Sequence, residues 1–472
     1  MRYISTRGAA PALEFDDVLL AGLAADGGLY LPESWPRLTV EELRGLAGLS
    51  YVETAVRIMT PFLGGRIPAE DFAALVRDSY AGFDHRAVAP LKQIGPDRWL
   101  LELFHGPTLA FKDYALQLVG RLFDHVLRRR GESITIVGAT SGDTGSAAID
   151  ACRDRAGIDI FILHPRGRVS EVQRRQMTTV TSANVHNIAV DGTFDDCQDL
   201  VKAMLNDAKL RAEMRLSAVN SINWARILAQ VVYYATAAIA VGAPDRAVAF
   251  AIPSGNFGNA YAGYVARQMG LPIARLVVAS NRNDILYRFI ETGTMATATV
   301  EPSLSPSMDI QVSSNVERLL FDYLYGRDGA RTAAAMTNFR ADGRLVLDEA
   351  ERRKLRRLFD GHREDDEGTK RAIADTFRET GEVIDPHTAV GVAAARAWRG
   401  PPGIPVIALA TAHAAKFPQA VEAAIGRTPP VPARLADIMK RPERCAVLPN
   451  DVAAVKDYVR GHRRESASRG AA

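Results

Sequence analysis

Hydrophobic and polar residues follow two different spacings along the chain. In the first 85 or so residues, apolar side chains recur every three or four positions, as in TVEELRGLAGLSYVETAVRIMTPFL and DFAALVRDSYAGF, which predicts amphipathic helices. From about residue 98, short continuous apolar runs alternate with helical sequence. The runs are WLLELF, SITIVG, IDIFILHP, ANVHNIAV, AVAFAIP, ARLVVAS and IPVIALA. Strands that alternate with helices in this way predict an α/β protein whose parallel sheets carry helices on both faces.

This change of spacing suggests where the domains lie. Residues 1–85 are expected to form a mainly helical N-terminal domain, and residues 86–440 a region of two α/β subdomains, the smaller at about 110–240. Residues 441–472 are expected to form a C-terminal segment whose small polar tail, GHRRESASRGAA, frays. Between about 325 and 385 the sequence is charged, and we expect a pair of solvated helices there.

Composition places the chain among ordinary globular proteins. Its 472 residues are too many for one simple core, and contents of 47% hydrophobic and 24% charged residues argue against disordered and fibrous classes. The net charge of +3 comes from 58 basic and 55 acidic residues that are interspersed along the chain. No nucleic-acid-binding surface is therefore indicated.

Cysteine usage and hydropathy narrow the expected compartment. Cys152, Cys197 and Cys445 are far apart and have neither a metal-binding nor a disulfide spacing, which fits a reducing cytoplasm. The start MRYISTRGAAP lacks the apolar core of a secretion signal, and the longest apolar run, VVYYATAAIAVGA, is shorter than the roughly 20 residues that span a bilayer. We expect a cytoplasmic protein with no metal and no membrane insertion.

Three of the predicted strand-to-helix junctions are unusually polar. GATSGDTGS follows SITIVG, SGNFGN follows AVAFAIP, and TAHAAK follows the last strand. Ligands of parallel sheets bind at these carboxyl ends. Glycines at 142, 145, 255 and 258 allow backbone N–H groups to converge on an anion at a helix N-terminus. Neither glycine loop matches GxGxxG or GxxxxGK[ST], so two anion sites are predicted and a nucleotide is disfavoured.

Lys112 stands in HGPTLAFKDYALQLVG, after a glycine-proline corner and before a helical run. Its default interpretation is a solvated surface charge. A buried lysine beside two anion sites would instead suit an aldehyde cofactor with a phosphate tail that holds an amino acid by its carboxylate. Pyridoxal phosphate has this shape, and lysine is its covalent anchor.

Several motifs together resemble the threonine synthase family, specifically its longer branch with an added N-terminal domain. They are HGPTLAFKDYALQ, GATSGDTGSAA, NSINWARILAQ, PSGNFGN, SPSMDIQVSSNVERLL and ATAHAAKFP, with MRYISTRG and DGGLYLP near the start. The resemblance implies a fold type II pyridoxal-phosphate enzyme, similar to the tryptophan synthase β subunit. It also implies a monomer or homodimer that converts O-phospho-L-homoserine and water to L-threonine and phosphate, the last step of threonine biosynthesis.

The resemblance assigns roles to residues of this chain. Lys112 would anchor the cofactor and act as the base, Asp143 would lie beside the cofactor's ring hydroxyl, and Thr411 would face its pyridine nitrogen. The cofactor phosphate would be held by Ser254, Gly255, Asn256, Phe257, Gly258 and Asn259. The substrate carboxylate would be held by Thr140, Ser141, Thr144 and Gly145, and the substrate phosphate by Asn220, Ser221 and Arg226.

Structural alternatives stand beside these roles. Thr411 precedes a predicted helix and could be its cap, and Asn220 and Ser221 could cap another helix with Arg226 on its surface. Ala414 follows His413 where relatives usually have proline, which affects only the loop shape. His105 and His413 receive no role.

Other functions on the same scaffold are also open. A serine or threonine dehydratase or a cysteine synthase would share the lysine and the phosphate loop, but NSINWAR argues against them because they need no second phosphate site. A noncatalytic, synthase-like binding protein is a further alternative. A nucleotide or phosphate enzyme that uses GATSGDTGS is a distant third.

Overall fold

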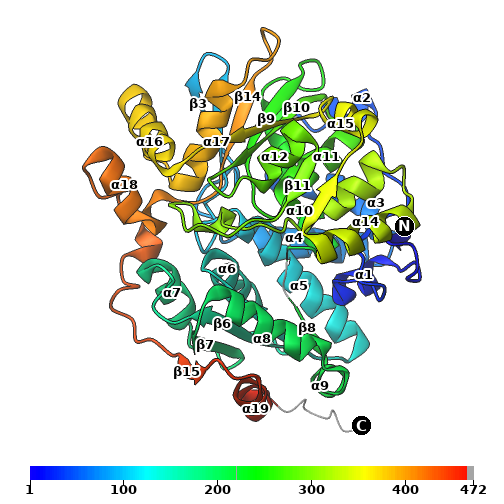
Figure 1. Ribbon diagram of the computed structural model, residues 1–472, viewed down its shortest axis with the longest axis vertical. Helices are drawn as coiled ribbons and strands as arrows, with labels where there is room; N and C mark the ends of the chain where they lie inside the picture. Colours follow the sequence, from blue (N-terminus) through cyan, green and yellow to red (C-terminus); the bar gives the residue numbers. More distant parts are fainter. Residues whose placement is uncertain (219–220, 465–472) are drawn as a thin grey trace. The chain divides into compact units, whose positions relative to one another are not determined.

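The computed structural model describes residues 1–218 and 221–464, which form two compact units (Figure 1). The larger unit comprises Met1–Val18, Leu23–Ala115 and Ser221–Pro430, and the smaller comprises Leu19–Gly22, Leu116–Asn220 and Val431–Ala472. The predicted α/β class is confirmed in both, because each contains a sheet of mainly parallel strands.

The N-terminal part of the larger unit is mainly helical, as predicted. Its elements are β1 (Tyr3–Ser5), α1 (Phe15–Ala21), β2 (Tyr30–Pro32), α2 (Val40–Arg44), α3 (Tyr51–Leu63) and α4 (Ala69–Tyr80). Capping boxes begin α2 at Thr39 and α3 at Ser50, so the first turns of both helices satisfy their exposed N–H groups. The short strands β1 and β2 pair antiparallel, which the helical spacing alone did not indicate.

The sheet of the larger unit has the strand order β13-β10-β9-β14-β4-β3. Its strands are β3 (Leu91–Gly95), β4 (Arg98–Glu102), β9 (Val248–Pro253), β10 (Ile273–Ser280), β13 (Phe359–Arg363) and β14 (Val406–Ala410). All neighbours are parallel except β3, which runs antiparallel to β4 at one edge. β9 and β14 are therefore adjacent, and the loops that follow them leave the same end of the sheet.

The larger unit contains further helices. They are α10 (Trp224–Ala240), α11 (Gly258–Gln268), α12 (Ile285–Thr292), α13 (Val316–Leu319), α14 (Gly329–Asp342), α15 (Glu349–Leu355), α16 (Asp366–Thr380), α17 (Pro386–Ala397) and α18 (Pro418–Ile425). Of these helices, α11, α12 and α17 pack on this sheet. Helix α17 packs on β9, β10 and β14, and its small residues Ala389 and Ala394 lie in the core with Ala408 of β14 (Figure 1). Helix α10 packs on α11 and α3.

The charged stretch at about 325–385 contains more than solvated helices, so that expectation was incomplete. Phe359–Arg363 forms β13, which pairs in parallel with β10. An edge strand has only one strand neighbour and tolerates polar residues such as Asp360 and His362. The strands β11 (Thr294–Ala296) and β12 (Arg344–Val346) form a separate antiparallel pair.

The smaller unit contains a five-stranded parallel sheet in the order β15-β7-β6-β5-β8. The strands are β5 (Ile134–Ala139), β6 (Ile158–Pro165), β7 (Val185–Asp191), β8 (Leu216–Ser217) and β15 (Ala446–Pro449). The helices are α5 (Lys112–Arg130), which begins in the larger unit, α6 (Asp143–Cys152), α7 (Glu171–Thr178), α8 (Phe194–Asn206), α9 (Ala208–Met214) and α19 (Val452–His462). Within the described ranges, no helix is long and apolar enough to cross a membrane.

Candidate active site

Lys112 is the first residue of α5 and is buried, with 8% of its surface exposed, so it is not a solvated surface charge. The segment before it runs beside the segment that follows β14. Phe111 N–H donates to the Thr411 carbonyl at 2.8 Å, and His413 N–H donates to the Leu109 carbonyl at 3.0 Å. These bonds place the candidate anchor beside the candidate partner of the pyridine nitrogen.

The glycine-proline corner before Lys112 is folded onto the next residue, Asp113. The Asp113 carboxylate accepts hydrogen bonds from Thr108 N–H at 2.8 Å and from the Thr108 hydroxyl at 2.6 Å. A Cβ on Gly106 would lie 2.5 Å from the Asp113 Cβ, so the turn requires glycine at that position. Leu109 has a left-handed φ of 61°, a strained backbone of the kind that clusters at functional sites.

The loop 254–259 joins β9 to α11, and its carbonyl groups are held by the segment 313–315. The Ser313 hydroxyl donates to the Gly255 carbonyl at 2.7 Å, and the Asn315 side-chain amide donates to the Asn256 carbonyl at 3.0 Å. Phe257 has a left-handed φ of 59° directly before the helix begins. The loop is thereby fixed at a helix N-terminus, which favours an anion.

Arg226 Nη1 and Asn259 Nδ2 are two of the buried nitrogen donors in the larger unit that have no hydrogen-bond partner among the described residues; Trp224 Nε1 and Arg327 Nη2 are others. Asn259 lies in the first turn of α11, and its Oδ1 accepts from the hydroxyls of Tyr233 at 2.6 Å and Tyr234 at 2.8 Å. Its amide N–H groups therefore point elsewhere. Buried donors without partners are rare and indicate a missing acceptor.

Arg226 is 4% exposed and lies in the first turn of α10, so the alternative of a helix-surface arginine is wrong. Burial lowers the pKa of its guanidinium to about 10, which still leaves it protonated at neutral pH. The cap of α10 is Asn223, whose side chain accepts from Ala225 N–H at 3.0 Å, and not Ser221. Ser221 instead gives its carbonyl to Asn315 Nδ2 at 3.0 Å, and Asn220 lies outside the described residues.

Thr411 directly follows β14 and is 5% exposed. The helix-cap interpretation of Thr411 is wrong, because the cap of the following 3-10 helix (Ala414–Lys416) is His413, whose Nδ1 accepts from Ala415 N–H at 3.1 Å. Burial lowers the pKa of His413, which suits a neutral ring that accepts this bond. Ala414 occupies the first helical position, where proline is also well tolerated.

The remaining predicted residues lie in the smaller unit, in the loop between β5 and α6. The Thr140 hydroxyl accepts from the N–H groups of Gly142 at 3.0 Å and Gly145 at 2.9 Å, which closes the loop. Asp143 is buried and accepts from Gln173 Nε2 at 2.7 Å. Ser141 and Thr144 are partly exposed and their side chains are accessible to a ligand.

The structure adds residues that the sequence did not single out. Ser307 Oγ lies 3.4 Å from Lys112 Nζ, and Ser307 N–H donates to His387 Nε2 at 3.2 Å. Ser307 belongs to the motif SPSMDIQVSSNVERLL, which carried the resemblance without a role for any residue. The sequence DPHT at 385–388 has the form of a helix N-cap followed by proline, which would have suggested only a cap.

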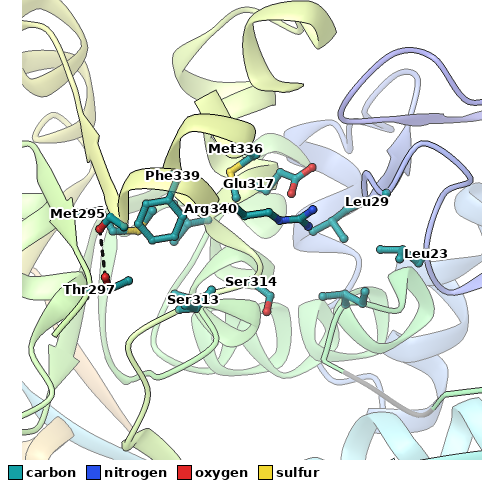
Figure 2. A pocket seen from close by; sticks show the side chains of 15 residues that line it. Leu23, Leu29, Met295, Thr297, Ser313, Ser314, Glu317, Met336, Phe339 and Arg340 are labelled. Carbon is teal, nitrogen blue, oxygen red and sulfur yellow. Dashed lines mark hydrogen bonds between the residues drawn. The ribbon is translucent and has the colours of Figure 1, made fainter. Parts of the chain in front are cut away.

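A cavity of about 380 Å³ is lined in part by residues of the segment 312–317, which also holds the loop 254–259. Figure 2 shows Met295, Met336, Phe339, Leu23 and Leu29 among its apolar lining and Ser313, Ser314, Glu317 and Arg340 among its polar lining. Of these, Ser313 also bonds to the Gly255 carbonyl. Lys112, Arg226 and Thr411 do not line this cavity, so it is separate from the groups described above.

Comparisons with known proteins cover nearly the whole chain. Three family descriptions match it: "Threonine synthase N terminus" at residues 2–80, "Pyridoxal-phosphate dependent enzyme" at 85–350 and "Threonine synthase, C-terminal" at 388–459. Threonine synthase of Pseudomonas aeruginosa is 58% identical over 463 residues, which covers 98% of each chain. The crystal structure of threonine synthase from Brucella melitensis with bound pyridoxal phosphate has a TM-score of 0.96 at 53% identity and covers 98% of this chain and 100% of that one. The yeast threonine synthase structure has a TM-score of 0.92 at 38% identity, with 98% of each chain covered.

Proposed function

The chain belongs to the threonine synthase family, and from this premise we propose that it converts O-phospho-L-homoserine and water to L-threonine and phosphate. It is a lyase of threonine biosynthesis that depends on pyridoxal phosphate and acts on a small molecule. The observation that carries the choice of substrate is Arg226, a buried guanidinium with an unpartnered N–H among the described residues. A substrate with its own phosphate supplies the acceptor that this group lacks.

The residues of the larger unit fit the cofactor. We assign Lys112 as its covalent anchor, and we assign its phosphate to the loop Ser254–Asn259, where Asn259 Nδ2 is a buried donor that an anion would satisfy. Thr411 would offer the pyridine nitrogen a neutral hydroxyl, and Asp143 of the smaller unit would meet the ring hydroxyl. When bound, pyridoxal phosphate delocalises negative charge that develops on the substrate carbons.

The substrate would be held at its two charged ends. We assign its phosphate to Arg226 and Ser221, with Asn220 as a third group, and its carboxylate to the loop of the smaller unit. In that loop the hydroxyls of Ser141 and Thr144 would donate to the carboxylate. Gly145 would contribute its position in the first turn of α6, and Thr140 keeps the loop closed by accepting from Gly145 N–H. A substrate without the phosphate would lack the bonds to Arg226 and would bind poorly.

Lys112 would carry the proton transfers. With the cofactor bound, the Lys112 amine would take the proton from the substrate's α carbon and later return one there. Arg226 would stabilise the phosphate as its bond to the γ carbon breaks, while the β carbon gives up a proton and the γ carbon takes one up. Water would then add at the β carbon, so that one water is consumed and one phosphate is released for each threonine. Burial of Lys112 keeps bulk water from competing for these protons.

We propose a cytoplasmic enzyme, either a monomer or a homodimer, that has no nucleic-acid partner and no metal. For its domains we propose an N-terminal domain at 1–85, a catalytic region at 86–440 whose smaller subdomain spans about 110–240, and a C-terminal segment at 441–472.

Incubation of the purified holoenzyme with phosphohomoserine tests the reaction. Phosphate and threonine should appear together in equal amounts. Release of phosphate with 2-oxobutanoate as the main product would instead indicate a dehydratase-like lyase. Borohydride reduction followed by peptide mapping tests the anchor: cofactor mass on the peptide that contains Lys112 is expected, and its absence would favour a noncatalytic binding protein.

A further inference from the structure

Asp385 is a fully buried carboxylate that caps α17 and also accepts hydrogen bonds from two side chains. Its backbone bonds are those of a cap: it accepts from His387 N–H at 2.9 Å and Thr388 N–H at 3.2 Å. It also accepts from two side chains, His387 Nδ1 at 2.8 Å and the Thr388 hydroxyl. These two side chains lead to the two parts of the candidate active site.

The first connection runs through His387 to Lys112. Ser307 N–H can only donate, so His387 Nε2, at 3.2 Å, must be the acceptor and the ring proton must lie on Nδ1, toward Asp385. The carboxylate therefore selects the tautomer that holds Ser307. The Ser307 hydroxyl in turn lies 3.4 Å from Lys112 Nζ.

The second connection runs through Thr388 to Thr411. The single hydroxyl proton of Thr388 is donated to Asp385, which leaves the oxygen lone pairs to accept Thr411 N–H at 3.2 Å. Thr411 also accepts Phe111 N–H, one residue before Lys112. One carboxylate thus orders the residue beside the lysine amine and the residue proposed to face the cofactor's nitrogen.

We propose that Asp385 is a positioning residue for the reaction, acting through His387 and Ser307 on the Lys112 amine and through Thr388 on Thr411. This inference rests on the proposed function and deepens it. A lysine amine that leaves and rejoins its cofactor must be held in reach of the substrate's α carbon between the two events. The Ser307 hydroxyl holds it there, and Asp385 keeps Ser307 in place.

The substitution Asp385→Asn distinguishes the proposed positioning of Lys112 and Thr411 from the capping of α17. Asparagine caps helices as well as aspartate does, so the stability of α17 should change little. Its amide N–H₂, however, replaces one of two accepting oxygens: His387 Nδ1–H bonds to Oδ1 and the Thr388 hydroxyl to Oδ2, so the single amide oxygen cannot occupy both positions. The imidazole proton would move to Nε2, where it meets Ser307 N–H, and the connection to Lys112 would break.

The matched control is Asp365→Asn. Asp365 caps α16 by accepting from Gly368 N–H at 2.7 Å, and it is exposed and has no bond to Lys112 or Thr411. A second variant, Ser307→Ala, removes only the hydroxyl beside Lys112 and leaves Asp385 and His387 unchanged. It keeps the test valid if Asp385→Asn fails to fold.

Steady-state kinetics and the absorbance of the resting holoenzyme against pH are the measurements. We expect Asp385→Asn to lower kcat by about 10- to 100-fold with KM nearly unchanged, the usual cost of losing a supporting hydrogen bond behind an active group. We expect its spectroscopic pH midpoint to move by about one pH unit, a tenfold change in proton affinity, and that of Ser307→Ala to move in the same direction. Asp365→Asn should match the wild type in both.

The outcomes distinguish this inference from the proposed function. The other ionisable groups around this network remain in every variant; they are His413, Asp309, Asp113, His105, Glu102 and Lys416. If Asp385→Asn and Ser307→Ala keep the wild-type midpoint and kcat, Asp385 is only a helix cap and the inference is wrong. If the wild-type holoenzyme itself shows no lysine-bound cofactor spectrum, the proposed function fails first. A change in melting temperature alone, without a change in kcat or midpoint, also overturns the positioning role.

Discussion

At the scale of single residues, the proposed role of Arg226 in binding the substrate phosphate implies a cost in the stability of the folded protein without substrate. A buried guanidinium with an unpartnered N–H destabilises the folded chain until an anion arrives. We expect Arg226→Met to raise the KM for phosphohomoserine by at least about 10-fold, because a charge-assisted hydrogen bond contributes about 1.5–3 kcal/mol. The melting temperature without substrate should be equal to or higher than that of the wild type.

The control for this prediction is Arg246→Met, since the Arg246 side chain is 42% exposed and pairs with Asp97 at the surface. It should leave KM unchanged. A normal KM in Arg226→Met would remove the phosphate role of Arg226. A large fall in its melting temperature would show that the guanidinium has a structural partner.

His186 gives the smaller unit a dependence on pH. Its ring stacks on Phe161 with centroids 4.4 Å apart, and burial lowers its pKa from 6.5 to about 4, helped by His462, Arg444 and Arg464. Between these two values the unfolded chain binds a proton that the folded chain excludes. The stabilisation from neutral His186 is therefore complete above about pH 6.5 and is lost as the pH falls toward 4.

The variant His186→Phe keeps the stacking and removes the titration. We expect the melting temperature of the wild type to fall more between pH 7 and pH 4.5 than that of His186→Phe, measured by calorimetry in the same buffers. Equal falls in the two proteins would assign the acid sensitivity to other groups.

Local motifs explain which site residues could be predicted from the sequence. The positions of Lys112 and of the loop Ser254–Asn259 are contained in short continuous runs whose glycines and lysine indicate chemistry directly. Ser307 and His387 could not be found in this way, because Ser307 is 195 residues from Lys112 and 80 residues from His387 along the chain. These residues come together only in the folded chain.

At the scale of elements, the segment 312–318 supports the loop 254–259, to which we assign the cofactor phosphate. Asn315 donates from one side-chain amide to the carbonyls of Asn256 and Ser221, at 3.0 Å each. In Asn315→Ala both carbonyls lose this donor, at a cost of about 1–3 kcal/mol for each buried group left unsatisfied. We expect the apoenzyme to bind pyridoxal phosphate about 10-fold or more weakly, as measured by fluorescence titration.

Val312→Ala is the matched control within the same segment, because Val312 is 55% exposed and its loss removes no hydrogen bond. Its cofactor affinity should equal that of the wild type. If Asn315→Ala also binds normally, the loop is held by other contacts, such as that of Ser313 with Gly255.

Elements with a clear hydrophobic pattern could be predicted from the sequence. Strands that depend on pairing with a neighbouring strand could not. The apolar runs that became β5, β6, β9 and β10 are nearly all buried, so hydrophobicity alone revealed them. β13 escaped prediction because an edge strand is stabilised by backbone pairing with β10 rather than by its own polar sequence. The two-residue β8 exists only because β5 lies beside it.

At the scale of the whole chain, the N-terminal domain contributes directly to the larger unit's core. The rings of Tyr3, Trp35 and Phe62 surround Trp224, the first residue of α10, with centroid distances of 6.0, 5.9 and 5.9 Å. The buried Arg318 donates to the Tyr30 carbonyl at 2.8 Å and also to Asn315. The spacing of residues 1–85 predicted a separate helical domain. A contact such as that of Arg318 with Tyr30, 288 residues apart along the chain, cannot be predicted from spacing.

The ion pair between Arg7 and Glu317 tests how far the N-terminal domain stabilises the rest. Arg7 Nε lies 3.0 Å from Glu317 Oε1, and the two side chains are only 10% and 5% exposed. Arg7→Gln would leave the buried Glu317 carboxylate with the hydrogen bond from the Thr6 hydroxyl, at 2.7 Å, as its remaining contact of this kind with the N-terminal domain. Because breaking a buried pair costs about 3–5 kcal/mol, we expect a clear fall in the urea midpoint of unfolding.

Arg44→Gln is the control that makes this prediction decisive. Arg44 also links the N-terminal domain to a distant residue, Asp245, with two hydrogen bonds at 2.6 and 3.2 Å, but the side chains are 54% and 66% exposed. Exposed pairs contribute about 0–1 kcal/mol, so its urea midpoint should stay close to that of the wild type. Cofactor affinity should fall only in Arg7→Gln, because Glu317 adjoins Arg318, which bonds to Asn315 behind the phosphate loop. Equal effects of the two substitutions would mean that burial of the Arg7 pair contributes nothing beyond a surface contact.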